Sequence, residues 1–93
     1  MGSEVAVGAN KGRVLTAVMR AATARVTQGT KIVQVRGESF TLAASLVRDI
    51  GLALGVSQAL VKQAIEDGAQ SGVLRVTRDA DSDEIVALRA DPL

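Results

Sequence analysis

Apolar residues recur at helical spacing in three stretches of this chain. The first, residues 11–28, follows a potential cap at Asn10 and stops before Gly29. Two shorter stretches follow, one capped by Thr41 and running to about Leu54, the other covering residues 58–71. The pattern therefore predicts three helices. The apolar stripe of the first helix consists of Val14, Leu15, Val18, Met19, Ala22 and Val26.

Short runs rich in β-branched residues lie between and after these helices. Residues 31–36 predict a strand, and Gly37 with Glu38 could turn it into a partner over residues 39–42, although the pattern leaves open whether residues 37–42 form a second strand. Residues 73–78 and 85–89 predict an antiparallel hairpin with a loop at residues 79–84. The expected fold class is α+β, with three helices, a short strand after the first helix and a C-terminal hairpin.

Three residues, Gly55, Val56 and Ser57, separate the second and third predicted helices. Gly55 lets the chain turn where a Cβ would cost energy, and Gly51, one helical turn earlier, lets the two helix axes approach closely. Ser57 is suited to cap the third helix, because its hydroxyl can accept a hydrogen bond from an amide of the first turn. Two helices joined by so short a turn form a helix-turn-helix.

The string from Asp49 to Ser57 resembles the helix-turn-helix of the winged-helix family of bacterial and phage transcription regulators. The likeness extends over roughly residues 11–88, because the predicted order of elements is that of a winged helix-turn-helix with the C-terminal hairpin as its wing. In that family the second helix of the motif enters the major groove of DNA, and the wing touches the neighbouring backbone or minor groove. The resemblance implies double-stranded DNA as the partner, and a small transcription regulator or a phage- or plasmid-type DNA-architecture protein as the function.

The resemblance also selects residues for DNA contact. Glutamine suits adenine, and Lys62 can reach guanine or a phosphate. The positions matching the groove-facing side of the family's helix are Ser57, Gln58, Ala59, Lys62, Gln63 and Glu66. Phosphate contacts are expected from Arg75 and Arg78 of the wing hairpin and from Arg13, Arg20 and Arg25 of the first helix.

Charge is divided unevenly along the chain, whose net charge is only +1. Residues 11–36 carry six basic and no acidic residues, whereas residues 37–93 carry five basic and nine acidic ones. The acidic loop at residues 79–84 could therefore meet the basic segment of a neighbouring copy. The long apolar stripe of the first helix exceeds what a small domain needs to cover one side of its core, which predicts a homodimer or higher self-association.

Two residues of the third helix depart from the family pattern. Leu60 replaces a small polar residue, and Gly68 stands where a core leucine is usual. Either another backbone approaches Gly68 closely or the helix ends early. An alternative function follows, a winged-helix protein interaction module that docks a partner on Leu60 and the surface at Gly68 and binds no DNA.

Composition narrows the remaining possibilities. The 93 residues can bury one core, which gives a flexible N-terminal arm (1–10), one domain (11–90) and a C-terminal tail (91–93). Without cysteine, histidine or tyrosine, no catalytic residues, enzyme activity, cofactor or small-molecule substrate is expected. The loop at residues 79–84 begins like a calcium loop but has Glu84 where glycine is required, so no metal is expected. The chain has no candidate membrane segment or secretion signal, which predicts a cytoplasmic, nucleoid-associated protein.

Overall fold

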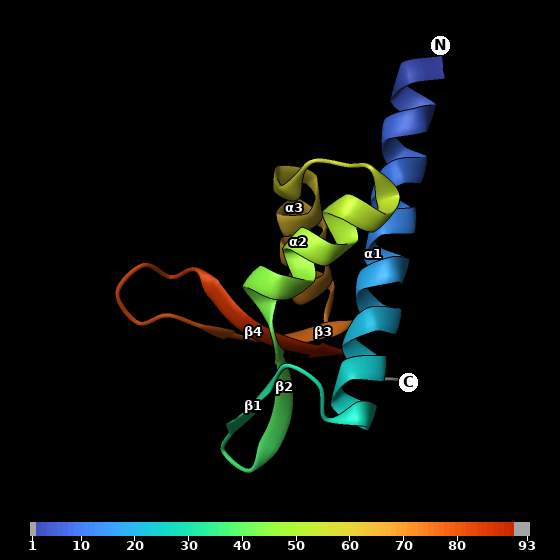
Figure 1. Ribbon diagram of the computed structural model, residues 1–93. Coiled ribbons are helices and arrows are strands. Elements are labelled where there is room, and N and C mark those ends of the chain that lie inside the picture. Colours follow the sequence, from blue (N-terminus) through green and yellow to red (C-terminus); the bar gives the residue numbers. More distant parts are fainter. Residues whose placement is uncertain (1, 91–93) are drawn as a thin grey trace.

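The computed structural model describes residues 2–90, which form three helices and one four-stranded antiparallel sheet (Figure 1). The predicted α+β class is confirmed, and the strand that the sequence left open exists. In chain order the elements are α1 (Gly2–Gln28), β1 (Ile32–Val35), β2 (Glu38–Leu42), α2 (Ala43–Leu54), α3 (Gln58–Ser71), β3 (Leu74–Arg78) and β4 (Ile85–Ala90). The C-terminal tail predicted at residues 91–93 lies outside the described residues.

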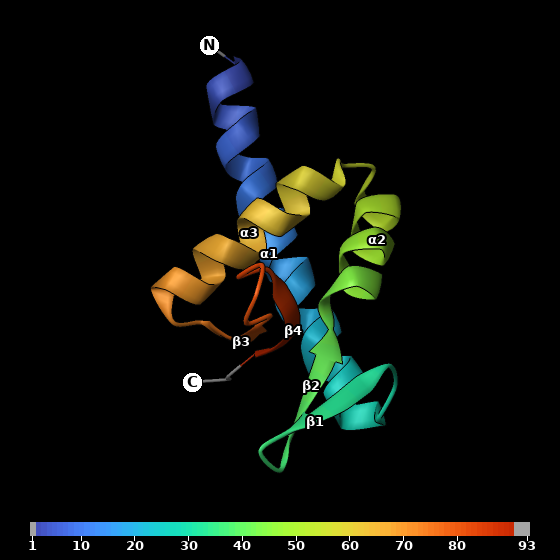
Figure 2. The same ribbon diagram turned by 90° about the vertical axis from the view of Figure 1, so that its left-hand side faces the viewer.

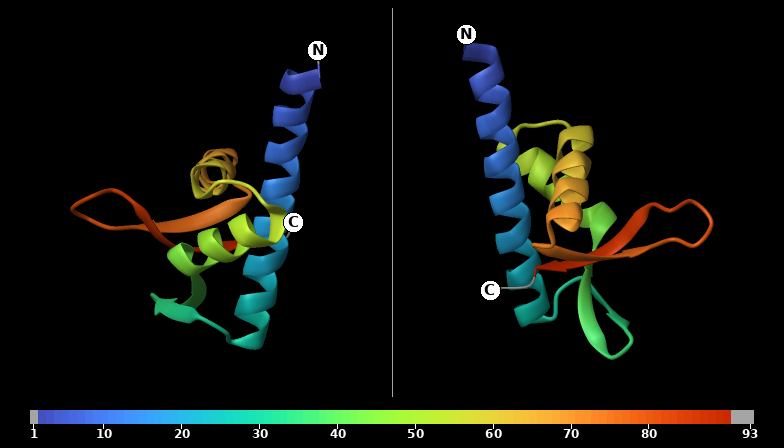
Figure 3. Two further views of the ribbon diagram at one scale, coloured as in Figure 1. Left: turned by 45° about the horizontal axis from the view of Figure 1, so that its top comes forward. Right: turned by 180° about the vertical axis from the view of Figure 1, so that it is seen from behind.

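Helix α1 begins at Gly2, so the prediction that the first helix starts at Lys11 after a cap at Asn10 is wrong. The capping signal was incomplete, because the residue three positions after Asn10 is Arg13 and not the glutamate or glutamine of a capping box. Extending a helix that already exists adds a hydrogen bond for each residue fixed, and residues 2–10 contain no proline to stop it. The first turns of α1 project past α2 and α3 (Figures 1 and 3).

The β1–β2 hairpin closes on a two-residue turn in which both residues, Arg36 and Gly37, have positive φ. Such turns match the right-handed twist of the strands they join. The predicted cap of α2 is wrong, because Thr41 belongs to β2 and is fully buried. Its hydroxyl donates to the carbonyl of Lys31 (3.2 Å), and Leu42 occupies the cap position without a side-chain hydrogen bond.

The strand order of the sheet is β1-β2-β4-β3, with every neighbouring pair antiparallel. Strand β2 meets β4 only through the pairs Thr41 with Leu88 and Leu42 with Ala87, where the two hairpins join. The β3–β4 hairpin projects away from the helices, and an irregularity in its pairing lies between Thr77 and Arg78 (Figure 3). The two edges of the sheet are β1 and β3.

The core is aliphatic and is shared by all three helices and the sheet. Helix α3 crosses over α1, with α2 lying to the side of that crossing (Figure 2). Within α1, Val14, Val18 and Ala22 are buried in this core, and Leu15 and Met19 pack against it. Five of the six residues of the predicted stripe therefore contribute to or pack against the core of the same chain, and Val26 is half-buried. The homodimer stays a prediction.

Neighbouring side chains approach Gly68 of α3 closely. A Cβ added there would lie 2.7 Å from Cδ1 of Leu74 and 2.9 Å from Cδ1 of Leu15. Both alternatives predicted for Gly68 are wrong, because helix α3 continues past this position to Ser71 and the close neighbours are side chains of α1 and β3, not another backbone. A side chain at Gly68 would require Leu74 and Leu15 to move, and Leu74 is buried in a close-packed core.

Substitutions at two helical glycines should change stability in opposite directions. We expect Gly68→Leu to lower the free energy of unfolding by about 1 to 3 kcal/mol, because the side chain overpacks a filled site. Gly12→Ala is the matched control, because no atom lies within 4 Å of the added Cβ. It should raise stability by up to about 1 kcal/mol through helix propensity alone. Urea unfolding measures both changes, and stabilisation by Gly68→Leu would show a hole where we describe close packing.

Candidate nucleic-acid interface

Helices α2 and α3 meet at 119° across residues 55–57. Gly55 has φ of 67°, and the amide of Val56 donates to the carbonyl of Gly51 (3.0 Å), which closes the end of α2. A Cβ at Gly51 would lie 3.1 Å from the carbonyl oxygen of Val56, so the close approach predicted there is confirmed. The hydroxyl of Ser57 accepts from the amide of Leu60 (3.1 Å), as predicted for a cap. Among the described residues no single helix is long and apolar enough to cross a membrane, and α2 with α3 reaches that length and composition only as this bent pair.

One side of α3 is buried and the other is exposed. The buried side consists of Val61, Ala64, Ile65 and Gly68. The structure brings the six predicted groove-facing residues together on the other side, where Glu66 is half-buried and five are exposed, namely Ser57, Gln58, Ala59, Lys62 and Gln63. Gln63 donates to Asp67 (3.1 Å), whose carboxylate also pairs with Lys11 (3.3 Å).

Two arginines of the β3–β4 hairpin, Arg75 and Arg78, are held by acids of the same chain. Arg75 donates two hydrogen bonds to Glu38 of β2, and its guanidinium lies over the ring of Phe40 at 5.8 Å from the centroid. Arg78 donates to both carboxylate oxygens of Glu66 (3.1 and 2.8 Å) and to the carbonyl of Asp83 (3.0 Å). Hydrogen bonds from Arg75 lower the pKa of Glu38, and those from Arg78 lower the pKa of Glu66. Both arginines were predicted to contact phosphate, but their hydrogen-bonding capacity is engaged within the chain.

Arg25 is also occupied internally. Its side chain is only 13% exposed, and it donates to Ser45 (2.9 Å) and to Asp49 of α2. Burial raises the pKa of Asp49, but Lys31, Arg25 and Arg48 together outweigh that effect and lower it. Arg25 therefore ties α1 to α2 and does not serve as a free cation.

Arg13 and Arg20 differ from these three arginines. Both are exposed on α1 and neither forms an ion pair or hydrogen bond with any residue of the described range 2–90. They line a shallow hollow on α1 together with Thr16, Ala17 and Leu54. No residue of α3 lines this hollow, so Arg13 and Arg20 form a surface separate from the exposed side of α3.

The tip of the β3–β4 hairpin is acidic and ordered by its own backbone. Asp79 accepts hydrogen bonds from the amides of Ser82 (3.0 Å) and Asp81 (2.8 Å), which lower its pKa. Within residues 2–90, no group of three or more histidine, cysteine or acidic side chains is placed to hold a metal ion. The tip presents negative charge where a wing would approach the DNA backbone.

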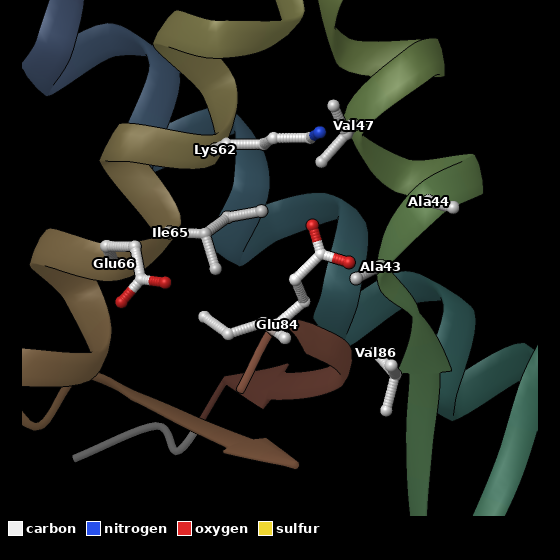
Figure 4. Close-up of a pocket in the computed structure, with 9 residues that line it drawn as sticks. Ala43, Ala44, Val47, Lys62, Ile65, Glu66, Glu84 and Val86 are labelled. Atoms are coloured by element: carbon white, nitrogen blue, oxygen red, sulfur yellow. The ribbon is translucent and has the colours of Figure 1, made fainter. Parts of the chain in front are cut away.

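A groove of about 360 Å³ lies between the start of α2, the exposed side of α3 and the start of β4 (Figure 4). Its walls carry Val47 from α2 and Ile65 from α3, and Lys62 and Glu84 point into it. No pattern in the sequence predicts this groove, because its lining residues come from three segments that only packing brings together. Nor did the sequence reveal Glu38 and Asp49 as arginine partners, since these pairs join residues 37 and 24 positions apart.

No family model, no curated protein and no solved structure matches the chain.

Glu38 should make stability depend on pH in acid. Its pKa is lowered in the folded state from an ordinary value of 4.5, so its contribution is present above that value and is lost as pH falls through the lower folded pKa. We expect the Tm of the wild type to fall more steeply than that of Glu38→Gln between about pH 5 and pH 3. Arg75→Gln should flatten the profile in the same way, since it removes the donor. Parallel profiles for all three proteins would contradict this role.

Proposed function

We propose that this protein binds duplex DNA, as a small transcription regulator or a phage- or plasmid-type DNA-architecture protein, with α3 in the major groove. The observation that carries this proposal is the exposed polar side of α3 after a three-residue turn, at 119° to α2. A crossing near 90–120° is what places the second helix of a helix-turn-helix outward from its domain. No described residue of another element covers Gln58, Ala59 or Lys62.

A winged helix-turn-helix is the arrangement that this function implies. The observed element order differs from that family's order only by an added strand, because β1 and β2 form a hairpin where one strand is usual. Strand β2 then pairs with β4 of the second hairpin, which occupies the position of a wing. These features support the winged-helix proposal.

Base readout would come from α3, and phosphate binding from a smaller set of residues than the sequence indicated. Gln58 and Gln63 are exposed and suited to adenine, while Lys62 suits guanine or a phosphate. The amides at the start of α3, beside Ser57, can hold a phosphate without charge. Arg13 and Arg20 are available for further phosphates, whereas Arg25, Arg75 and Arg78 are engaged. So few free cations predict weak, salt-sensitive non-specific binding.

The alternative function, a protein interaction module, was expected to dock its partner on Leu60 and the surface at Gly68, and neither residue is fully exposed. Gly68 is buried beneath Leu15 and Leu74 of the same chain, and Leu60 is half-buried against the core. Leu52 is 78% exposed on α2, but a single exposed leucine is ordinary for a protein surface. The DNA-binding proposal therefore has the better support.

Self-association and location follow as part of the same proposal. A homodimer would pair two α3 helices on a two-fold symmetric site, using a surface other than the buried stripe of α1. A protein of this kind would act on nucleoid DNA in the cytoplasm.

Selection from randomised duplexes tests the proposal, because it reports DNA binding, half-site symmetry and spacing together. We expect enrichment of a site and an affinity that falls as salt rises. Failure to retain any duplex at low ionic strength would refute DNA binding.

Two glutamines of α3 provide a matched pair for the role of its outer side. We expect Gln63→Ala to cost about 1 to 3 kcal/mol on the selected site and little on random DNA, because it removes a base contact. Gln70, exposed near the end of α3, is the control, and Gln70→Ala should leave both affinities unchanged. Arg20→Ala should weaken all sequences alike, because its partner is a phosphate. Equal losses on specific and random duplexes for Gln63→Ala would exclude base reading.

Releasing Arg78 from its internal partner should strengthen DNA binding. Glu66→Ala removes the acceptor of two hydrogen bonds and leaves a free guanidinium beside α3. We expect the dependence of log K on log salt to steepen by about 0.9, the value for one added phosphate contact. Asp83→Asn removes the same charge but keeps the carbonyl that Arg78 contacts, and it should leave the slope unchanged. The proposal for Arg78 fails if Glu66→Ala/Arg78→Ala keeps the gain.

A further inference from the structure

The groove between α2, α3 and β4 combines an apolar wall with two charges that the fold does not use. Its volume of about 360 Å³ lies within the range of pockets that hold small molecules, about 300–1,000 Å³. The apolar lining comes from Ala43 and Val47 of α2, Ile65 of α3 and Ile85 of β4. This surface would take an aliphatic group of a few carbons.

Lys62 and Glu84 carry the two charges, and Figure 4 shows both side chains directed toward the space between α2 and α3. Lys62 extends from α3 toward Val47. The carboxylate of Glu84, the residue just before β4, points into the same space. Within the described part of the chain neither forms an ion pair, although four other acids in the domain, Glu38, Asp49, Glu66 and Asp67, each hold a basic partner. Glu66 also lines the groove, but its carboxylate is held by Arg78.

We propose that this groove binds a free aliphatic α-amino acid in its zwitterionic form. The ammonium of Lys62 would hold the ligand's carboxylate, and the carboxylate of Glu84 would hold its ammonium. The aliphatic side chain would lie on Val47, Ile65 and Ile85. A zwitterion satisfies both charges at once, whereas a simple carboxylic acid or amine leaves one of them unmatched.

The position of Lys62 gives this binding a consequence for DNA, and this step rests on the proposed function. Lys62 belongs both to the groove and to the exposed side of α3 that would face the major groove. A bound amino acid would neutralise that ammonium and occupy the space between α3 and the wing. The ligand would therefore weaken DNA binding.

The test of binding uses the full chain without DNA and L-leucine as the probe. The chain has four isoleucines, and two of them, Ile65 and Ile85, line the groove while Ile32 and Ile50 lie elsewhere. We expect saturable shifts of the methyl NMR signals of Ile65 and Ile85 alone. 4-Methylpentanoate, which lacks the amine, and 3-methylbutylamine, which lacks the carboxylate, should each bind about 10- to 100-fold more weakly than L-leucine.

Charge variants test which residue holds each end of the ligand. Lys62→Met should lower the affinity for L-leucine to that of the wild type for 3-methylbutylamine. Glu84→Gln should lower it to that of the wild type for 4-methylpentanoate. Two variants that remove a charge away from the groove serve as controls, Arg36→Asn and Asp81→Asn. Asparagine is chosen at position 36 because Arg36 has a positive φ, which asparagine tolerates. Neither variant should change the affinity for L-leucine. Ala44→Leu, on an exposed position at the groove, should block binding without changing charge.

Three results would each overturn the proposal. They are equal affinity for the three compounds, NMR shifts at Ile32 or Ile50 as large as those at Ile65 and Ile85, and no saturable shift at all. The DNA step is measured separately, as the affinity for a selected duplex with and without saturating L-leucine. A protein that binds L-leucine but no duplex would refute the proposed function and leave the groove assignment standing. Unchanged DNA affinity at saturation would refute only the coupling.

Discussion

Helix α3 packs on α1 and β3 at Gly68, and this contact constrains how the three helices are arranged. The δ-carbons of Leu74 and Leu15 lie within 3 Å of where a Cβ would be, so a side chain at Gly68 would require these leucines or α3 itself to move. Gly51 allows a similar close contact near the start of α3, where the last turn of α2 packs against the carbonyl of Val56. Together these two glycines set how deeply α3 is seated, and so which of its residues face outward. Close-packed interiors transmit such small displacements to the surface.

The distribution of charge is governed by pairing more than by composition. Glu38, Asp49 and Glu66 engage Arg75, Arg25 and Arg78, and these pairs tie β2 to β3, α2 to α1 and α3 to the β3–β4 hairpin. The pairs of Arg75 and Arg78 are exposed enough to contribute only about 0 to 1 kcal/mol to stability, whereas Arg25 is largely buried. Each pair also affects function, because an external anion must compete with an internal acid for the arginine. Among the described residues, the exposed cations without an internal partner are Arg13, Arg20, Arg36 and Lys62, and these are the ones available to an external anion.

Lys62 takes part in both proposed activities, DNA binding and amino-acid binding. It is exposed on the outer side of α3, and it also lines the groove together with Glu84. A cation shared in this way can bind a phosphate, a base edge or a small carboxylate, but only one of them at a time. Competition for one ammonium couples two ligands without any change in the fold.

Most local elements and their junctions could be predicted from the sequence. The turn at Gly55, the cap at Ser57 and the β3–β4 hairpin depend on residues close together in the chain. The β1–β2 hairpin was left open, and Gly68 was recognised as unusual without its neighbours being known. The sequence prediction misplaced the start of α1 and the role of Thr41, where a plausible cap competed with continued helix and with strand pairing. Which arginines are engaged, and the groove between α2, α3 and β4, became apparent only from the folded chain. Those features depend on distances between side chains far apart in the chain, which packing sets and local sequence does not encode.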